Sequence, residues 1–446
     1  MNVPVIEFPW FGNGTVIALI ATIHVLISHG VAIGAIAVTV SLERKAMMTN
    51  NAKLDQVARR LAKWILIVTT TAGAMTGVGI WISTTVLEPA AIGSLLRIFF
   101  WAWFVEWIVF VSEVVLLLIY FYTWDKWLGA KKQLHYRLGV ALAVASWLTA
   151  AIITGVLAAK LTPGKWTETL SFWNAFFNPT YVPSLFFRTF VAIALAISFI
   201  ALIAKFRIKD RELQGTIFTV LGKWMAVSLP AMLIFGGWYL SKIPPQAYEQ
   251  VVWSTGMPPQ MFNVINLAGL AVLIIFAIWL IVKPKRVPIV LAIAVWGASL
   301  GYIAEFEMVR ESVRKPFVIY DYMYANGILA SDVDMYNEEG FLPHMSLLGV
   351  TEVTEDNLHA SGRAVYQGQC LSCHTIDGWR TKRAFANRLD GWSEETIATY
   401  VSTLHETRPF MPPFVGTDEE LEALAHYLAT EVTKANDQSL AQGGDE

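Results

Sequence analysis

Eight apolar runs, each long enough to cross a bilayer, constrain this chain more than any other feature. A membrane-spanning helix needs about 20 consecutive apolar residues. The runs occupy about residues 14–41, 61–87, 98–122, 138–159, 184–205, 219–240, 263–283 and 287–313. No Lys or Arg precedes the first run, so it does not read as a secretory signal peptide. The pattern predicts an all-α membrane protein with a bundle of eight transmembrane helices.

The composition agrees with a membrane protein and excludes several other classes. Hydrophobic residues make up 55% of the 446 residues and charged residues only 15%, whereas soluble domains carry about 25% charged residues. The 18 tryptophans fit a protein with two membrane interfaces, where indole rings collect. The net charge of −2 and the lack of a basic block argue against nucleic acid as a partner.

Loop charges predict the orientation of the bundle. Lys and Arg gather after the first, third, fifth and seventh runs, whereas the alternate loops carry few. The positive-inside rule then places the charged loops in the cytoplasm and both chain ends outside. We therefore expect a protein of the bacterial inner membrane whose N-terminus and C-terminal segment face the periplasm.

The C-terminal segment carries a motif for covalent haem. Cys370-Leu371-Ser372-Cys373-His374 has the C-x-x-C-H spacing, in which two thiols attach the haem and the histidine binds its iron. A zinc site is the alternative, but it needs two further ligands at similar spacing, and the sequence offers no second pair. The motif predicts one haem c with His374 as an axial ligand.

The sixth iron ligand is predicted to be Met411, on the proline-rich loop Arg408–Phe414. His405 and His426 are weaker alternatives, since His426 falls on an amphipathic terminal helix from Asp418 to about Val432. The segment resembles a small monohaem cytochrome c.

The sequence predicts four parts in chain order: a membrane domain at 1–330, a linker at 331–353, a small all-α cytochrome c domain on the outer face at 354–434, and a flexible tail at 435–446.

Ionisable residues inside the spans are costly, so each is a functional hypothesis. Helix direction places His24, Glu106 and Arg188 in the outer half of the membrane, and Glu311 near the outer face. Glu113 is nearer the middle and shares a helix stripe with Glu106, about two turns away. His29 lies five residues after His24 and points elsewhere. Two roles fit His24: it binds a haem iron, or it forms a hydrogen bond to a neighbouring helix.

At these residues the membrane part resembles subunit I of cytochrome bd-type quinol oxidases over about residues 1–330. The resemblance is carried, in order along the chain, by His24 and Glu43, Gly73–Gly77, Glu106 and Glu113, Trp124–Lys126, and Glu311–Tyr320. It implies that His24 and Glu311 bind one or two haems of b or d type, with Arg314 as a further cofactor contact. It also implies that Glu106 and Glu113 conduct protons, and that a second bd-like membrane subunit is present.

The sequence also departs from that family. The family spaces its two carboxylates eight residues apart, whereas Glu106 and Glu113 are seven apart. The ligands of its low-spin haem b align with Arg188 and a residue near Ile265, neither of which can replace them. The outer loop that oxidises quinol in the family is reduced to about residues 241–262. The family's ninth span is replaced by the polar segment and the haem c motif.

These losses and gains favour an electron route through the outer haem c. The leading hypothesis is a bd-like oxidase that reduces oxygen with electrons from a periplasmic c-type cytochrome or another redox partner. One alternative is a conduit between membrane quinone and c-type cytochromes within a larger complex. Another is a haem-free membrane anchor for the cytochrome c domain. For Glu311, an ion pair with Arg310, Arg314 or Arg188 competes with haem ligation.

Overall fold

A computed structural model describes residues 6–245, 247, 259–345 and 348–443. The chain divides into two compact units. Residues 22–77 and 99–313 form the first, which we call the bundle unit. Residues 1–21, 78–98 and 314–446 form the second, which we call the cytochrome unit. The cytochrome unit therefore includes the first part of the first span, the last part of the second span and residues 314–330, all of which the sequence assigned to the membrane domain.

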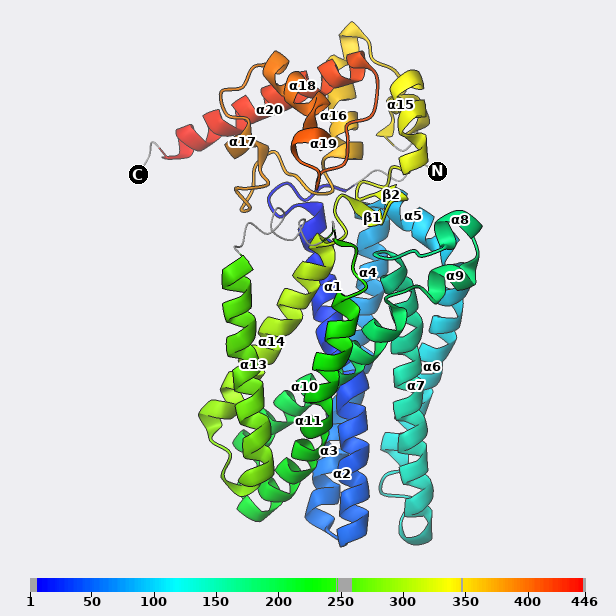
Figure 1. The fold of residues 1–446 in the computed structure, drawn as a ribbon, viewed down its shortest axis with the longest axis vertical. Coiled ribbons are helices and arrows are strands. Elements are labelled where there is room, and N and C mark those ends of the chain that lie inside the picture. Colours follow the sequence, from blue (N-terminus) through cyan, green and yellow to red (C-terminus); the bar gives the residue numbers. More distant parts are fainter. Residues whose placement is uncertain (1–5, 246, 248–258, 346–347, 444–446) are drawn as a thin grey trace. The chain divides into compact units, whose positions relative to one another are not determined.

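Long helices dominate the N-terminal three quarters of the chain (Figure 1). In chain order they are α1 (Asn13–Ile27), the π-helix η1 (Ser28–Ala35), α2 (Ile36–Thr49), α3 (Ala52–Val68), the π-helix η2 (Thr69–Gly73), α4 (Ala74–Leu87), α5 (Pro89–Ile98), α6 (Phe100–Thr123), η3 (Gly129–Lys131), α7 (Lys132–Ala159), α8 (Trp166–Thr169), α9 (Phe172–Phe176), α10 (Tyr181–Arg207), α11 (Arg211–Leu240), α13 (Pro259–Val282), η4 (Pro284–Arg286) and α14 (Ile289–Ser312).

The eight predicted spans are confirmed among the described residues. The first two are the longest, as continuous helical runs over Asn13–Thr49 and Ala52–Leu87. Short polar caps turn the chain between spans. Asn50 ends α2 in the left-handed conformation with φ of 46°, and the Asn51 side chain accepts a hydrogen bond from the Leu54 amide at 3.0 Å. Asp210 caps α11 in the same way.

The core of the bundle unit is built around α10, whose buried face is rich in alanine. Gly34 of η1 packs directly on this helix, because a Cβ atom at Gly34 would lie 2.1 Å from the carbonyl oxygen of Ala192. The π-helical turns η1 and η2 interrupt the first two spans at this depth. Such turns are frequent at functional sites, and the two histidines of the first span flank the start of η1.

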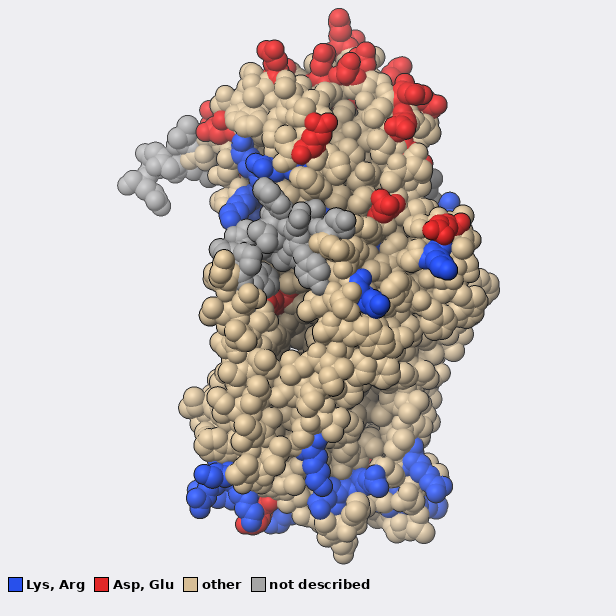
Figure 2. Space-filling view, in the orientation of Figure 1, with Lys and Arg blue, Asp and Glu red and all other residues tan. Residues whose placement is uncertain are grey.

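One end of the bundle unit is basic. Lys and Arg gather at the end where α2 joins α3, α6 joins α7, α10 joins α11 and α13 joins α14 (Figure 2). This is the asymmetry from which the sequence predicts a cytoplasmic end.

The cytochrome unit adds a small helical fold after the last span. Its further elements are β1 (Phe317–Ile319), β2 (Met323–Tyr324), η5 (Ala330–Asp332), α15 (Val333–Glu339), η6 (Leu342–His344), η8 (Glu355–Asn357), α16 (Leu358–Gln369), α17 (Phe385–Arg388), α18 (Glu394–Ser402), α19 (Leu404–Thr407) and α20 (Asp418–Gly443). The two strands pair antiparallel. Helices α16 and α20 cross closely at Gly362, where a Cβ atom would lie 2.0 Å from the Ala423 carbonyl oxygen.

Two boundaries differ from the sequence expectation. Residues 331–353, expected to be a linker, pack into the core of the cytochrome unit through Tyr336, Phe341 and Leu342. The buried carboxylate of Glu420 holds this segment, since it accepts hydrogen bonds from the Phe341 and Leu342 amides at 2.8 and 2.7 Å. The terminal helix α20 also runs on to Gly443, well past Val432, so most of the expected flexible tail is helical.

Candidate haem and proton sites

The haem c motif begins where α16 ends and forms a tight turn. The amides of Cys373 and His374 both donate to the Cys370 carbonyl, at 3.1 and 2.9 Å. The two cysteines are not joined by a disulfide. Burial raises the pKa of the Cys370 thiol to about 12, so this group stays a protonated thiol at neutral pH. The turn presents two thiols and one imidazole, as covalent haem attachment requires.

His374 is oriented as an iron ligand should be. Its Nδ1 lies 3.0 Å from the Arg383 carbonyl oxygen, and its ring stacks on Phe385 at 4.7 Å between centroids. A hydrogen bond from Nδ1–H to a carbonyl fixes the tautomer that leaves Nε2 free for a metal. Burial lowers the pKa of His374 to about 4, so the ring is neutral at physiological pH. The residues therefore fit a haem c.

The three candidates for the sixth ligand lie in different surroundings. The carbonyl oxygen of Met411 lies 2.6 Å from Nδ1 of His405, so His405 holds the backbone of the Met411 loop. His426 is placed on α20, 3.0 Å from the Glu394 carboxylate. This ion-pair geometry suits a surface residue, as the sequence indicated. Met411 keeps its place as the predicted ligand.

His24 also has an oriented imidazole. Its Nδ1 lies 3.1 Å from the hydroxyl oxygen of Thr76 on the second span. That hydroxyl donates to the Ala72 carbonyl at 2.7 Å, so it can accept the hydrogen bond from Nδ1–H. The ring passes close to Gly77, where a Cβ atom would lie 3.1 Å from Cε1 of His24. An imidazole whose Nδ1 is held in this way fits an axial haem ligand that binds through Nε2.

His29 takes part in a different cluster, which fills the region of Arg188. The guanidinium of Arg188 lies 3.4 Å from Nε2 of His29 and 3.9 Å from the Glu307 carboxylate. Arg310 donates twice to the same carboxylate, at 2.9 and 2.7 Å. Arg188 is only 5% exposed and stacks over the Phe306 ring. A guanidinium engaged in this way cannot bind iron.

The second position that aligns with a ligand of the low-spin haem, near Ile265, cannot bind iron either. Ile265 is 46% exposed on α13 and has no ligand atom. The neighbouring Asn266 donates to the Glu305 carboxylate at 2.5 Å, which ties α13 to α14. The residues present therefore do not fit the family's low-spin haem b. Most of the shortened outer loop at 241–262 lies outside the described residues.

Glu311 and Arg314 lie where the last span ends. Glu311 is an exposed residue in the last turn of α14. Arg310 and Arg188 both lie against the Glu307 carboxylate, one turn earlier in the helix, and the charge of Glu311 also acts on Arg310, so the ion pair remains an alternative to haem ligation. Arg314 is 5% exposed and donates to the Val318 carbonyl at 2.9 Å, inside the cytochrome unit.

The two carboxylates of the third span differ in burial. Glu113 is 7% exposed and accepts hydrogen bonds from Ser146 at 2.6 Å and from Thr149 at 3.4 Å. Both donors lie on α7, so the carboxylate bridges two spans. Glu106, two turns away along α6, is half-buried. A carboxyl held by two hydroxyls in a membrane interior can gain and release a proton.

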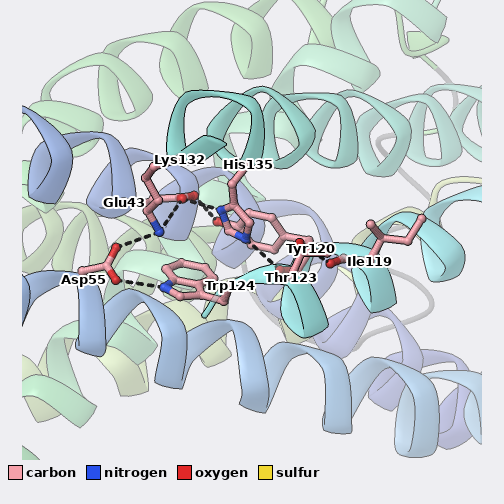
Figure 3. A network of polar contacts seen from close by, with 8 residues as sticks. All are labelled: Glu43, Asp55, Ile119, Tyr120, Thr123, Trp124, Lys132 and His135. Carbon is pink, nitrogen blue, oxygen red and sulfur yellow. Dashed lines mark hydrogen bonds and ion pairs between the residues drawn. The ribbon is translucent and has the colours of Figure 1, made fainter. Parts of the chain in front are cut away.

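A polar cluster at the basic end of the bundle escaped the sequence analysis (Figure 3). Glu43 is fully buried. Its carboxylate lies 2.5 Å from Nδ1 of His135, accepts a hydrogen bond from the Tyr120 hydroxyl at 2.7 Å, and pairs with Lys132 at 3.0 Å. Lys132 also pairs with Asp55 at 3.0 Å. One sequence feature indicates this cluster: Tyr120 continues the seven-residue spacing of Glu106 and Glu113 along α6.

Comparison with known proteins matches the membrane helices and the C-terminal segment to two different families. Residues 15–246 match the model of the family described as cytochrome bd terminal oxidase subunit I. Residues 357–428 match that described as cytochrome c oxidase, cbb3-type, subunit III. The fold is similar to the structure of bd oxidase from Geobacillus thermodenitrificans, with a TM-score of 0.55 and 16% identity over 81% of this chain and 99% of that one. None of the curated proteins matches this chain.

Proposed function

Because the chain belongs to the cytochrome bd terminal oxidase subunit I family, we propose that it reduces oxygen at a haem in the bundle with electrons that arrive through haem c. The family and the cytochrome c match make the chain a respiratory electron-transfer membrane protein. The finer proposal is carried by His24, whose imidazole Nδ1 lies 3.1 Å from the Thr76 hydroxyl of the second span.

Bound haem would supply one-electron transfer and, where the iron keeps an open position, oxygen binding. In the cytochrome unit, Cys370 and Cys373 would hold the haem, and His374 and Met411 would bind its iron. In the bundle unit, His24 and Glu311 would hold a b- or d-type haem. The Arg188 cluster supports a route without the low-spin haem through which the family passes electrons from quinol.

Protons for oxygen reduction would pass Glu113 and Glu106. Ser146 and Thr149 hold the Glu113 carboxyl between two spans, which favours a fixed proton-accepting position. The buried Glu43 and His135 pair offers a proton-exchanging group at the basic end of the same bundle. Glu113→Gln should retain haem but slow oxygen consumption by about 10²–10⁴-fold, as expected for loss of an acid–base group. Ser112→Ala, on the same helix, is the control.

Charge supports a cationic protein as the electron donor. Residues 331–446 contain 20 acidic and 7 basic residues, a net charge of −13, whereas the rest of the chain carries 26 basic and 15 acidic residues, a net charge of +11. Acidic side chains gather over the part of the cytochrome unit formed by α15, α18 and α20 (Figure 2). Complementary charge speeds encounter between redox proteins and makes the rate depend on salt. A basic c-type cytochrome on the outer side fits this surface.

The test is the reduced spectrum of the purified complex with and without carbon monoxide. The proposal predicts a covalent c-type signal together with an extractable haem whose spectrum shifts on binding carbon monoxide. An extractable haem that does not shift would instead indicate a six-coordinate conduit between quinone and c-type cytochromes. A c-type signal alone would indicate a membrane anchor. Either of these results contradicts the proposal.

A further inference from the structure

The segment ahead of the first span is bound to the loop that follows the haem c motif, within the cytochrome unit. The amide of Trp379 donates to the Trp10 carbonyl and its indole Nε1–H donates to the Phe11 carbonyl, both at 3.4 Å. Arg380 donates to the hydroxyl of Thr15 at 3.4 Å. The two backbones approach so closely that a Cβ atom at Gly378 would lie 2.6 Å from the Trp10 carbonyl oxygen.

Large aromatic side chains at this junction face outwards. Trp10, Phe11 and Trp379 are 57%, 48% and 51% exposed. Since the first span begins at Asn13, Trp10 and Phe11 lie where a membrane-spanning helix leaves the hydrocarbon. Trp379 donates hydrogen bonds to the carbonyls of both residues and therefore lies at a similar depth. Exposed aromatic rings at this level are typical of the belt that contacts lipid headgroups.

Positive charge is concentrated at the same place. Four of the seven basic residues in 331–446 fall between positions 380 and 388, in a segment that is otherwise strongly acidic. Two of them, Arg380 and Arg383, line a small open cavity beside Cys373. Its other polar walls are formed by Thr15, Ser372 and Thr375. Guanidinium groups and hydroxyls are the donors that bind phosphate oxygens.

We propose that this cavity binds the phosphate of an anionic phospholipid headgroup, with Trp10, Phe11 and Trp379 set among the neighbouring lipids. The lipid would hold the haem c attachment loop at the membrane surface and place a negative charge beside the haem-attachment thiol of Cys373. Such a lipid site requires only that the first span crosses a membrane, so it does not depend on oxygen reduction. A phospholipid is favoured over free phosphate because the cavity opens among exposed aromatic rings at the start of a span.

The experiment uses the full chain, with haem c attached, in phosphatidylcholine nanodiscs that contain phosphatidylglycerol. Native mass spectrometry of the protein released from them counts retained phosphatidylglycerol. Because each surface cation contributes about 1 kcal/mol toward anionic lipid, Arg380→Gln and Arg383→Gln should each weaken its binding by about fivefold. Arg380→Lys should keep most of the binding. Lys434→Gln on α20 removes one exposed cation away from the cavity and should change nothing.

A second readout is the reduction potential of haem c, which should be lower in discs containing phosphatidylglycerol than in pure phosphatidylcholine. A nearby negative charge favours the oxidised iron. This difference should disappear in the Arg380→Gln, Arg383→Gln double variant. The proposal is overturned if the arginine variants retain phosphatidylglycerol like the wild type, or if both lipids are retained equally. It is also overturned if inorganic phosphate displaces the lipid completely, which would indicate a site for a soluble anion.

Discussion

The surroundings of His374 and His24 show two ways of preparing an imidazole for iron. In both, Nδ1 has a hydrogen-bond partner: the Arg383 carbonyl for His374 and the Thr76 hydroxyl for His24. The partner of His374 lies nine residues away, whereas that of His24 lies 52 residues away on another span. The cytochrome site is therefore encoded in one short segment, whereas the membrane site exists only once two helices have packed.

The difference extends to how each haem would be retained. Two thiols hold the haem covalently beside His374, so its presence does not depend on the strength of an iron bond. In the bundle, retention depends on ligands and packing. Mutations should therefore act in an all-or-none way on haem c attachment and in a graded way on the membrane haem. The following substitutions separate these two behaviours.

The largest effect is expected from Cys370→Ala, which removes one of the two thioether attachments. Covalent haem should be lost or severely reduced when denatured protein is stained for haem peroxidase activity. Ser372→Ala, which lies between the two cysteines, should keep full staining. Full staining of the Cys370→Ala protein would mean that this motif does not attach haem.

A graded loss is expected from Thr76→Val, which keeps the shape of the side chain but removes the oxygen that orients His24. Loss of such a supporting hydrogen bond costs about 10–100-fold in affinity at metal sites. The extractable haem per covalent haem should fall accordingly during purification. Thr70→Val is the matched control, since the Thr70 hydroxyl donates only to the Leu66 carbonyl of its own helix. Equal haem retention in both variants would remove Thr76 from the site.

A smaller effect, on the bundle itself, is expected from Gly34→Leu. The new side chain would meet the backbone of α10, because even a Cβ atom would lie 2.1 Å from the Ala192 carbonyl oxygen. Overpacking of this kind costs about 1–3 kcal/mol. The midpoint of thermal unfolding should fall, while covalent haem staining stays unchanged. Gly297→Leu is the control, since nothing lies within 4 Å of a Cβ atom there.

The smallest structural effect is expected from Met411→Ala. The covalent haem should remain, but the iron should lose its thioether ligand and its reduction potential should fall, since a methionine ligand raises the potential of a c-type haem. Redox titration of haem c checks this. A potential equal to that of the wild type would move the sixth ligand to His405, His426 or another residue.

The sequence predicts those parts of the molecule that depend on nearby residues. The eight spans follow from apolar runs, and the haem c motif follows from five consecutive residues. The partners of buried polar groups do not, because they are separated by many positions and meet only through helix packing. Glu43 and His135 are 92 residues apart. Arg188 and Glu307, which lie on different spans, also meet only through packing.

The central claim, that the bundle holds a haem through His24 and Glu311, is tested most directly by counting haem. Extractable haem per covalent haem should be measured in membranes carrying His24→Ala, Glu311→Ala and, as a control, His29→Ala. The account predicts that the first two variants lose membrane haem and its spectrum, whereas the His29 variant keeps both. Unchanged haem content and spectra in the His24 and Glu311 variants would contradict a bd-like haem site in this bundle.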